Sequence, residues 1–269
     1  MTRYPTSKID ELCQLAAQIR LNAVGMVGIQ GFGYLGQALS AGDIYAVLFG
    51  GGVLRPLHDR FVLSPGHYAV VFYAVAAELG LIERSELESY GLDGALLEAI
   101  STERTPLIDL SCGSLGQGLS GAIGFALASR FANDDRRTFA FLSDGEMEEG
   151  QVWEAAMFAA HHKLSNLVAV IDANNSQVDG TITSVTTIEP LADKWRAFGW
   201  HVEEVDGHDV EALLKAFSAA SQGKPLVVIA RTNIVGRMKS FPPSVDGHFI
   251  KLDPALQSAV VAELQDTNA

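Results

Sequence analysis

The residues best suited to chemistry form an acidic cluster directly after an apolar run. Four carboxylates fall within six positions: Asp144, Glu146, Glu148 and Glu149. A helix that begins near Gly150 accounts for one or two of them, because acidic side chains favour the positive end of a helix. It does not account for the Asp-Gly turn at 144–145. Hard divalent cations prefer carboxylate oxygens, so Asp144 is a candidate metal ligand.

A second oxygen donor follows the next apolar run along the chain. Ala-Asn-Asn comes directly after the run 166–172 and places Asn174 just beyond it. If the two runs are neighbouring parallel strands, Asp144 and Asn174 lie at the same edge of a sheet, where ligands bind in such folds. An Asp, an Asn amide oxygen and a backbone carbonyl suffice for Mg²⁺ when phosphate oxygens complete its shell. The pair therefore predicts a cation that holds a diphosphate.

The segments that position these residues alternate between two periodicities. Beyond about residue 100 the apolar runs are 137–143, 166–172, 200–206 and 225–232, and the helical stretches between them are 152–164, 191–199 and 210–220. This alternation is typical of βαβ units. Because the runs are continuous rather than alternating, helices are expected on both faces of the sheet. We predict a doubly wound, mainly parallel α/β sheet in a single domain, 1–269.

The first hundred residues have a helical pattern. A helix over 7–24 is expected to open on a Ser N-cap, and one over 67–80 to close on a Gly. The stretch 31–36, GFGYLG, matches the GxGxxG fingerprint of nicotinamide-binding folds literally. A helix rather than a strand precedes it, so the context argues against that use.

Composition limits the classes of function. The 269 residues are 48% hydrophobic with a formal net charge of −13, which favours a sizeable core and disfavours nucleic acid or anionic membranes as partners. No apolar stretch is expected to approach the roughly 20 residues of a membrane span, and the N-terminus lacks a signal-peptide core, which predicts a cytoplasmic protein. Cys13 and Cys112 are expected to be reduced, largely buried thiols.

The Asp-Gly pair followed by Asn after the next strand resembles the thiamine-diphosphate motif GDG…NN. The stretch from Asp144 to Asn175 resembles transketolase, including the N-terminal subunits of split transketolases. Further segments extend the resemblance in order: SAGDIYAVLF (40–49), DRFVLSPGHYA (59–69), CGSLGQGLSGAIGFALA (112–128), DGHD (206–209) and GRMKSF to DGHF (236–249). The resemblance implies a thiamine-diphosphate-binding fold. It also implies transfer of a two-carbon ketol unit from a ketose or ketose phosphate donor to an aldose acceptor.

The resemblance assigns roles to residues at the cofactor end. Asp144, Asn174 and the backbone carbonyl of Ser176 would bind Mg²⁺, or another divalent cation such as Ca²⁺ or Mn²⁺. Gly145 would bring its N–H to the diphosphate. His67 and His248 would line the diphosphate and the reaction site as hydrogen-bonding or proton-transferring groups.

The resemblance also implies packing and partner contacts. Leu115 would lie against the cofactor, as would Gly113. Five glycines within twelve residues are too many for an ordinary helix, so each is expected to permit a close approach: Gly113, Gly116, Gly118, Gly121 and Gly124. Glu149 and Glu154 would face a partner chain. For Glu146 and Glu148, a position on a solvated helix face is nearly as good an interpretation as a role in the site.

Two departures from the family lie at the sugar end of the site. Tyr34 stands where the family has a histidine that contacts substrate hydroxyls, and a phenol with a pKa of about 10 does not shuttle protons near neutral pH as imidazole does. The family's GHP is missing near Ala99. Ser143 replaces the first Gly of GDG, a change that the backbone tolerates. The departures predict a donor with different substituents around the cleaved bond.

The length of the chain predicts a partner. Whole transketolases add a pyrimidine-binding domain, whose glutamate activates the cofactor, and a third C-terminal domain, for which 269 residues leave no room. The resemblance therefore implies a separate C-terminal, pyrimidine-binding subunit, two copies of each chain, and sugar phosphate substrates.

Two alternatives stay open. One is another thiamine-diphosphate enzyme, such as a deoxyxylulose-phosphate synthase or a 2-oxo acid dehydrogenase subunit, against which EMEEGQVWEA (146–155) favours transketolase. The other is a non-catalytic structural subunit, which the missing histidines would fit. The presence of both Asp144 and Asn174 argues against it.

Overall fold

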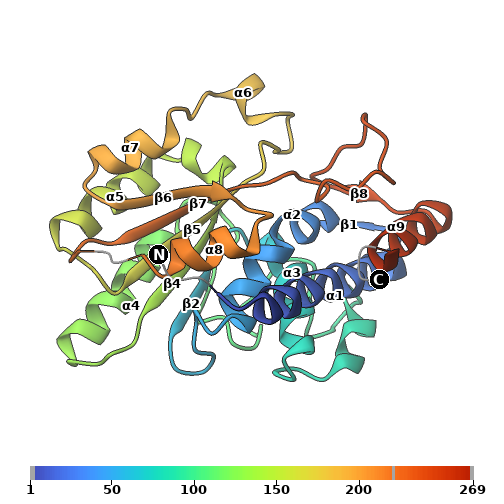
Figure 1. The fold of residues 1–269 in the computed structure, drawn as a ribbon, viewed down its shortest axis with the longest axis horizontal. Coiled ribbons are helices and arrows are strands. Elements are labelled where there is room, and N and C mark those ends of the chain that lie inside the picture. Colours follow the sequence, from blue (N-terminus) through green and yellow to red (C-terminus); the bar gives the residue numbers. More distant parts are fainter. Residues whose placement is uncertain (1–3, 220–221, 267–269) are drawn as a thin grey trace.

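A parallel sheet of six strands forms the centre of the computed structural model, which describes residues 4–219 and 222–266 (Figure 1). Its strands are β2 (Arg60–Leu63), β3 (Leu110–Ser111), β4 (Thr138–Ser143), β5 (Leu167–Ala173), β6 (His201–Asp206) and β7 (Leu226–Arg231). Their order across the sheet is β3-β2-β4-β5-β7-β6, and every neighbouring pair is parallel. Two short strands, β1 (Phe32–Gly33) and β8 (Ile250–Lys251), pair antiparallel beside it.

Helices lie on both faces of the sheet, and further helices extend the fold beyond it (Figure 1). They are α1 (Thr6–Gln30), α2 (Leu35–Tyr45), α3 (Ala69–Glu78), α4 (Gly118–Phe131), α5 (Gly150–His161), α6 (Ile182–Val185), α7 (Leu191–Ala197), α8 (Val210–Phe217) and α9 (Pro254–Asp266). Alternate side chains of β4 enter two separate apolar clusters. Phe139 and Phe141 pack with α1, α2, α3 and α8, whereas Ala140 and Leu142 pack with α4, α5 and α7. The predicted doubly wound parallel sheet is confirmed.

The strand predictions succeed where an apolar run is long. The four predicted runs correspond to β4, β5, β6 and β7 within one residue at each end. β4 and β5 are buried along their whole length, whereas β6 is partly exposed because it lies at the edge of the sheet. The prediction of a helical first hundred residues missed two strands, the two-residue β1 and the four-residue β2, which pairs with β4.

The N-terminal helix differs from its prediction. α1 begins at Thr6 after Pro5, with no side-chain cap, and ends only at Gln30, where Gly31 takes a left-handed conformation (φ 73°). Ser7 is therefore inside the helix rather than its N-cap. The predicted Gly closure after α3 is confirmed, with Gly80 at φ 66°. Since a helix directly precedes GFGYLG, the nicotinamide fingerprint lacks its strand.

Two expectations drawn from composition are corrected along α1. Its 25 residues are long and apolar enough to meet the length and composition test for a membrane span, although half of its most apolar window is buried inside the fold. The exposed thiol of Cys13 lies on this helix, and only Cys112 is buried. Burial of one helix face against α2, α3 and α9 explains its apolar character.

The glycine-rich segment 113–124 permits close approach at three of its five glycines. A Cβ at Gly116 would lie 2.8 Å from Glu149 Cβ, and one at Gly118 or Gly121 would overlap Ser64 or Leu110. Nothing lies within 4 Å of the corresponding position at Gly113 and Gly124. The expectation that all five permit a close approach is therefore wrong for these two.

α4 offers a matched pair of substitutions that tests this packing. Gly118→Ala is expected to lower the free energy of unfolding by about 1–3 kcal/mol, because the new methyl group would meet Ser64, including its Cα at 2.8 Å. Gly124→Ala is expected to raise it by about 0.5–1 kcal/mol, since Ala favours the helix and the site is open. Urea unfolding of the two variants checks both signs. Equal stability of the two variants would contradict the packing argument.

Candidate active site

The acidic cluster begins where β4 ends, beside the end of β5. Ser143 pairs with Asp172 across the two strands, so the loops that follow are neighbours, as predicted. Asp144 is only 3% exposed. Its Oδ1 accepts the N–H of Gly145 (3.0 Å) and its Oδ2 accepts the N–H of Asn175 (2.6 Å). Asp144 therefore joins the two loops.

A second buried carboxylate, Asp172, organises the end of β5. Its Oδ2 accepts hydrogen bonds from Ser40 Oγ (2.6 Å), Tyr68 OH (2.8 Å) and Asn174 Nδ2 (3.0 Å), and its Oδ1 accepts one from the Thr232 hydroxyl. This residue was missed by the sequence reasoning. The available signal was a charged residue closing an otherwise apolar run.

Asp172 fixes the orientation of Asn174. The amide nitrogen of Asn174 donates to Asp172 and to Tyr68 OH (3.0 Å). Its amide oxygen is left to accept the N–H of Ser176 (2.9 Å), with a second lone pair available. A buried, oriented oxygen therefore stands on the loop that contacts Asp144.

Glu146 is fully buried. The sequence had left a solvated helix face open for this residue, and the structure excludes that position. Its carboxylate accepts hydrogen bonds from the Ser64 hydroxyl and from the N–H groups of Gly116 (2.8 Å) and Ser143 (3.1 Å). Burial raises the pKa of Glu146 to about 7. The side chain thus ties together the ends of β2 and β4 and the glycine-rich loop.

The remaining acidic residues of the cluster lie further out. Glu148 is half-buried and accepts a hydrogen bond from Gln177 Nε2 (3.1 Å). Glu149 and Glu154 are exposed, on the turn before α5 and on α5 itself. Their prediction as partner contacts stays a prediction.

The buried carboxylates fit a bound divalent cation. Within residues 4–219 and 222–266, neither Asp144 nor Asp172 forms an ion pair. Burial, and then the charge of Asp172, raises the pKa of Asp144 to about 7. Buried charges in proteins are normally paired or coordinate a metal. The nearby donors are a carboxylate and an amide oxygen, which are hard oxygen ligands of the kind that Mg²⁺ prefers.

A cavity of about 340 Å³ lies beside these loops. Seven of the predicted site residues line it: Tyr34, His67, Gly113, Leu115, Gly145, Ser176 and His248. Asp144 instead lines an adjoining cavity of about 170 Å³, and Asn174 lines neither. The structure thus gathers most of the predicted site around one cavity, whereas the two side chains predicted to bind a cation, Asp144 and Asn174, do not line it.

One end of this cavity is aromatic. The ring centroids of His67 and His248 are 5.2 Å apart, and the ring of Tyr34 lies 5.3 and 5.8 Å from them. Burial and the neighbouring His248 lower the pKa of His67 to about 3, and burial lowers the pKa of His248. Both imidazoles are therefore neutral at pH 7, each with one donor and one acceptor nitrogen.

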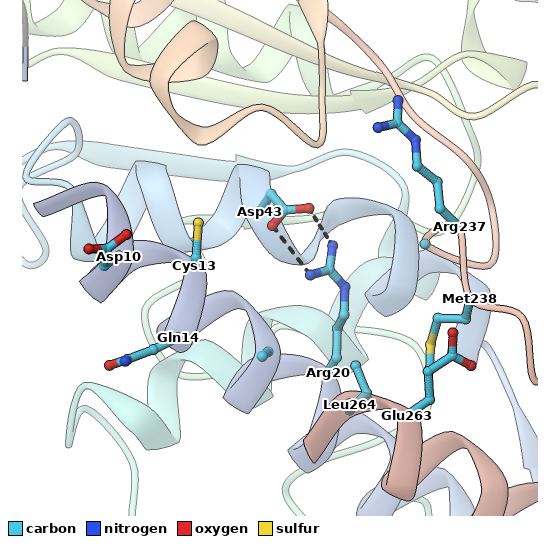
Figure 2. A pocket seen from close by; sticks show the side chains of 11 residues that line it. Asp10, Cys13, Gln14, Arg20, Asp43, Arg237, Met238, Glu263 and Leu264 are labelled. Atoms are coloured by element: carbon cyan, nitrogen blue, oxygen red, sulfur yellow. Dashed lines mark hydrogen bonds and ion pairs between the residues drawn. The ribbon is translucent and has the colours of Figure 1, made fainter. Parts of the chain in front are cut away.

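A larger cavity of about 530 Å³ lies away from this site, between α1, α9 and the loop at Arg237 (Figure 2). Its central groups already have partners. Arg20 is bound bidentately to Asp43 (2.5 and 3.3 Å), which also contacts His208 Nδ1 (2.9 Å). Arg237 is paired with Asp206 (2.8 Å). Arg20, Asp43 and Arg237 are thus engaged in contacts within the fold. We therefore do not assign a catalytic site to this cavity, although it is the larger of the two.

Comparison with known proteins identifies the family of the chain. The family model described as the transketolase, thiamine diphosphate binding domain matches residues 12–257. The chain belongs to this family. The predicted resemblance to transketolase is thereby confirmed, and so is thiamine diphosphate as the ligand of the domain. The roles of individual residues toward that ligand stay predictions.

Two relatives of the transketolase family are similar over most of their length. The chain is 37% identical to the 6-deoxy-6-sulfo-D-fructose transketolase subunit SqwG of Clostridium sp. (strain MSTE9), covering 96% of this chain and 98% of that protein. It is 38% identical to one of the apulose-4-phosphate transketolase subunits of Phocaeicola vulgatus, covering 65% of this chain and 63% of that protein.

A solved transketolase shares the fold. The crystal structure of transketolase from Campylobacter jejuni superposes with a TM-score of 0.84 and 25% identity, over 97% of this chain. The chain spans 43% of the length of that transketolase. The match therefore concerns the diphosphate-binding part of the larger enzyme.

Proposed function

We propose that this chain is the diphosphate-binding subunit of a split transketolase, which transfers a two-carbon ketol unit from a ketose donor to an aldose acceptor. One observation carries the proposal. Two buried carboxylates, which form no ion pair with any residue that the structure describes, lie at the ends of adjacent parallel strands, beside a cavity lined by two neutral histidines. Near-complete coverage of a relative named as a transketolase subunit supports the division into two chains.

The cation would be held by this chain. Asp144, Asn174 and the carbonyl of Ser176 are the proposed ligands of Mg²⁺, or of Ca²⁺ or Mn²⁺ in its place. The N–H of Gly145, proposed to meet the diphosphate, donates to Asp144 Oδ1 (3.0 Å) in this structure. A diphosphate would therefore compete with the Asp144 carboxylate for this N–H. A bound cation would favour the diphosphate in this competition, because it would attract the carboxylate to itself. When bound, thiamine diphosphate supplies the electron sink for cleaving and forming the bond next to a carbonyl.

The side chains around the cavity would hold the sugar. His67 and His248 are both neutral. We propose that they donate hydrogen bonds to substrate hydroxyls, accept hydrogen bonds from them, and transfer protons to and from these hydroxyls. Gly113 and Leu115 line the same cavity and are proposed to lie against the cofactor. Because no lysine or arginine is among the described residues that line the cavity, the anionic end of a substrate would bind elsewhere, on the partner subunit.

The proposed donor is a ketose with substituents unlike those of the common transketolase donors. Tyr34 places a phenol and an aromatic wall where the family resemblance calls for an imidazole. The two named relatives act, by their names, on 6-deoxy-6-sulfo-D-fructose and apulose 4-phosphate. Relatives of this chain are thus named for two different sugar substrates, which supports the proposal of a non-standard donor.

The partner would complete the site. A pyrimidine-binding subunit would supply the glutamate that activates the cofactor, and Glu149 and Glu154, both exposed at the start of α5, are proposed to face it. We propose two copies of each chain and a cytoplasmic enzyme.

Isolation of the native complex tests the proposal. Native mass spectrometry in Mg²⁺ buffer is expected to show a heteromer that retains thiamine diphosphate. That complex is then assayed with xylulose 5-phosphate, 6-deoxy-6-sulfofructose, apulose 4-phosphate and pyruvate. Turnover of a ketose only with both subunits supports the proposal. Turnover of pyruvate alone would assign another thiamine-diphosphate enzyme, and a cofactor-free homomer would assign a structural subunit.

A further inference from the structure

Gln37, in the first turn of α2, contacts one of the two cavity histidines. The side chain lines the cavity although the residue is only 1% exposed. Its Nε2 lies 3.3 Å from His248 Nδ1 and 3.2 Å from the backbone carbonyl oxygen of His248. Its Oε1 is buried and has no hydrogen-bond partner among the described residues. Nothing in the sequence motifs pointed to this residue.

The carbonyl of His248 decides which way the Gln37 amide faces. A carbonyl oxygen can only accept, so the amide atom beside it must be the nitrogen; the opposite orientation would place two oxygens 3.2 Å apart. The NH₂ group then donates one hydrogen to the carbonyl and the other to Nδ1. An Nδ1 that accepts has no hydrogen of its own. The neutral imidazole of His248 therefore carries its hydrogen on Nε2.

We propose that Gln37 is a positioning residue of the site: it holds His248 in the Nε2–H form as a donor, and offers its own Oε1 as an acceptor to a hydroxyl of the sugar. An unpaired buried amide oxygen is unfavourable, and a bound hydroxyl satisfies it. Donor and acceptor would thus stand side by side at the aromatic end of the cavity. The acceptor half rests on the proposed function, whereas the tautomer half does not.

The ring of His248 is also restrained by packing. Tyr34 lies edge-on to it at 87°, with centroids 5.8 Å apart, and Tyr34 packs against Phe249 at 5.2 Å. Because these contacts limit rotation of the imidazole, the hydrogen bond from Gln37 selects a tautomer in a ring that is already oriented. A purely structural role of Gln37, tying α2 to the segment around His248, would leave the tautomer without a preference.

Nitrogen NMR of the full chain labelled with ¹⁵N-histidine tests the tautomer. His248→Asn identifies the signal by its loss. At pH 8 the wild-type chain is expected to show His248 with its hydrogen on Nε2 and none on Nδ1. Gln37→Met removes the donor with little change of volume and is expected to let the hydrogen populate Nδ1. Gln14→Met, at an exposed position on α1, is the matched control and is expected to change nothing. A hydrogen on Nδ1 in the wild type, or no change in Gln37→Met, overturns the proposal.

Kinetics of the two-subunit complex tests the acceptor. With the ketose that turns over, Gln37→Met is expected to lower kcat/KM by about tenfold or more, with the Kd of thiamine diphosphate unchanged. Gln14→Met is the matched control. Wild-type kcat/KM in Gln37→Met overturns the acceptor role. If no ketose turns over, the proposed function fails, and the NMR result still decides whether Gln37 sets the tautomer.

Discussion

Asp144→Asn is expected to weaken thiamine diphosphate binding in Mg²⁺ buffer by about 100-fold or more. The amide keeps the shape of the side chain and can still accept the N–H of Asn175 or Gly145. It removes the negative charge that a cation needs at this position. Burial raises the pKa of the Asp144 carboxyl to about 7, so the apo chain gains little from the charge itself. Its free energy of unfolding is expected to fall by only about 1–2 kcal/mol, because one of the two backbone N–H groups loses its acceptor. Calorimetric titration of the complex with the cofactor measures the affinity.

Two controls make the result specific to the cation. Asp179→Asn removes an exposed charge from the rim of the cavity that His67 and His248 line, and this variant is expected to bind the cofactor as the wild type does. Chelation of Mg²⁺ from the wild type is expected to reproduce the loss seen in Asp144→Asn. Wild-type affinity in Asp144→Asn would move the cation away from this carboxylate, and a large fall in the stability of the apo variant would make the loss non-specific.

Prediction from sequence succeeded where local periodicity carries the information. β4 and β5 are apolar along their whole length, so their runs stand out, and the loops after them could be placed side by side from the sequence alone. β2 and β3 have four and two residues, which are too few to show a period. These two strands form because they hydrogen-bond to strands that are distant in the sequence. A local sequence pattern carries no information about such long-range hydrogen bonds.

The site divides in the same way. Asp144, Asn174 and the cavity histidines belong to motifs that are local in sequence, and sequence reasoning named them. Asp172 and Glu146 were not recognised as the anchors of the site, because each is defined by partners from several segments. Ser40, for example, lies 132 residues before Asp172. Gln37 was missed for the same reason, since its contact with His248 spans 211 residues.

The largest loss of stability is expected from Asp172→Ala, at about 3–5 kcal/mol. The carboxylate accepts hydrogen bonds from three hydroxyls and one amide, all around the end of β5. Its removal leaves these donors buried without that acceptor and leaves a small void at the end of β5. Urea unfolding of the apo chain measures the loss.

The comparison with Asp193→Ala shows whether burial is the cause. Asp193 is exposed and forms a surface ion pair with Arg196 (2.7 Å), so its removal is expected to change the free energy of unfolding by less than about 0.5 kcal/mol. Asp172→Ala is also expected to weaken cofactor binding, because Asn174 loses the contact that orients its amide oxygen. If stability falls while cofactor affinity is kept, Asp172 supports the sheet but does not position Asn174. If neither changes, the hydrogen bonds to Asp172 do not hold this end of the sheet together.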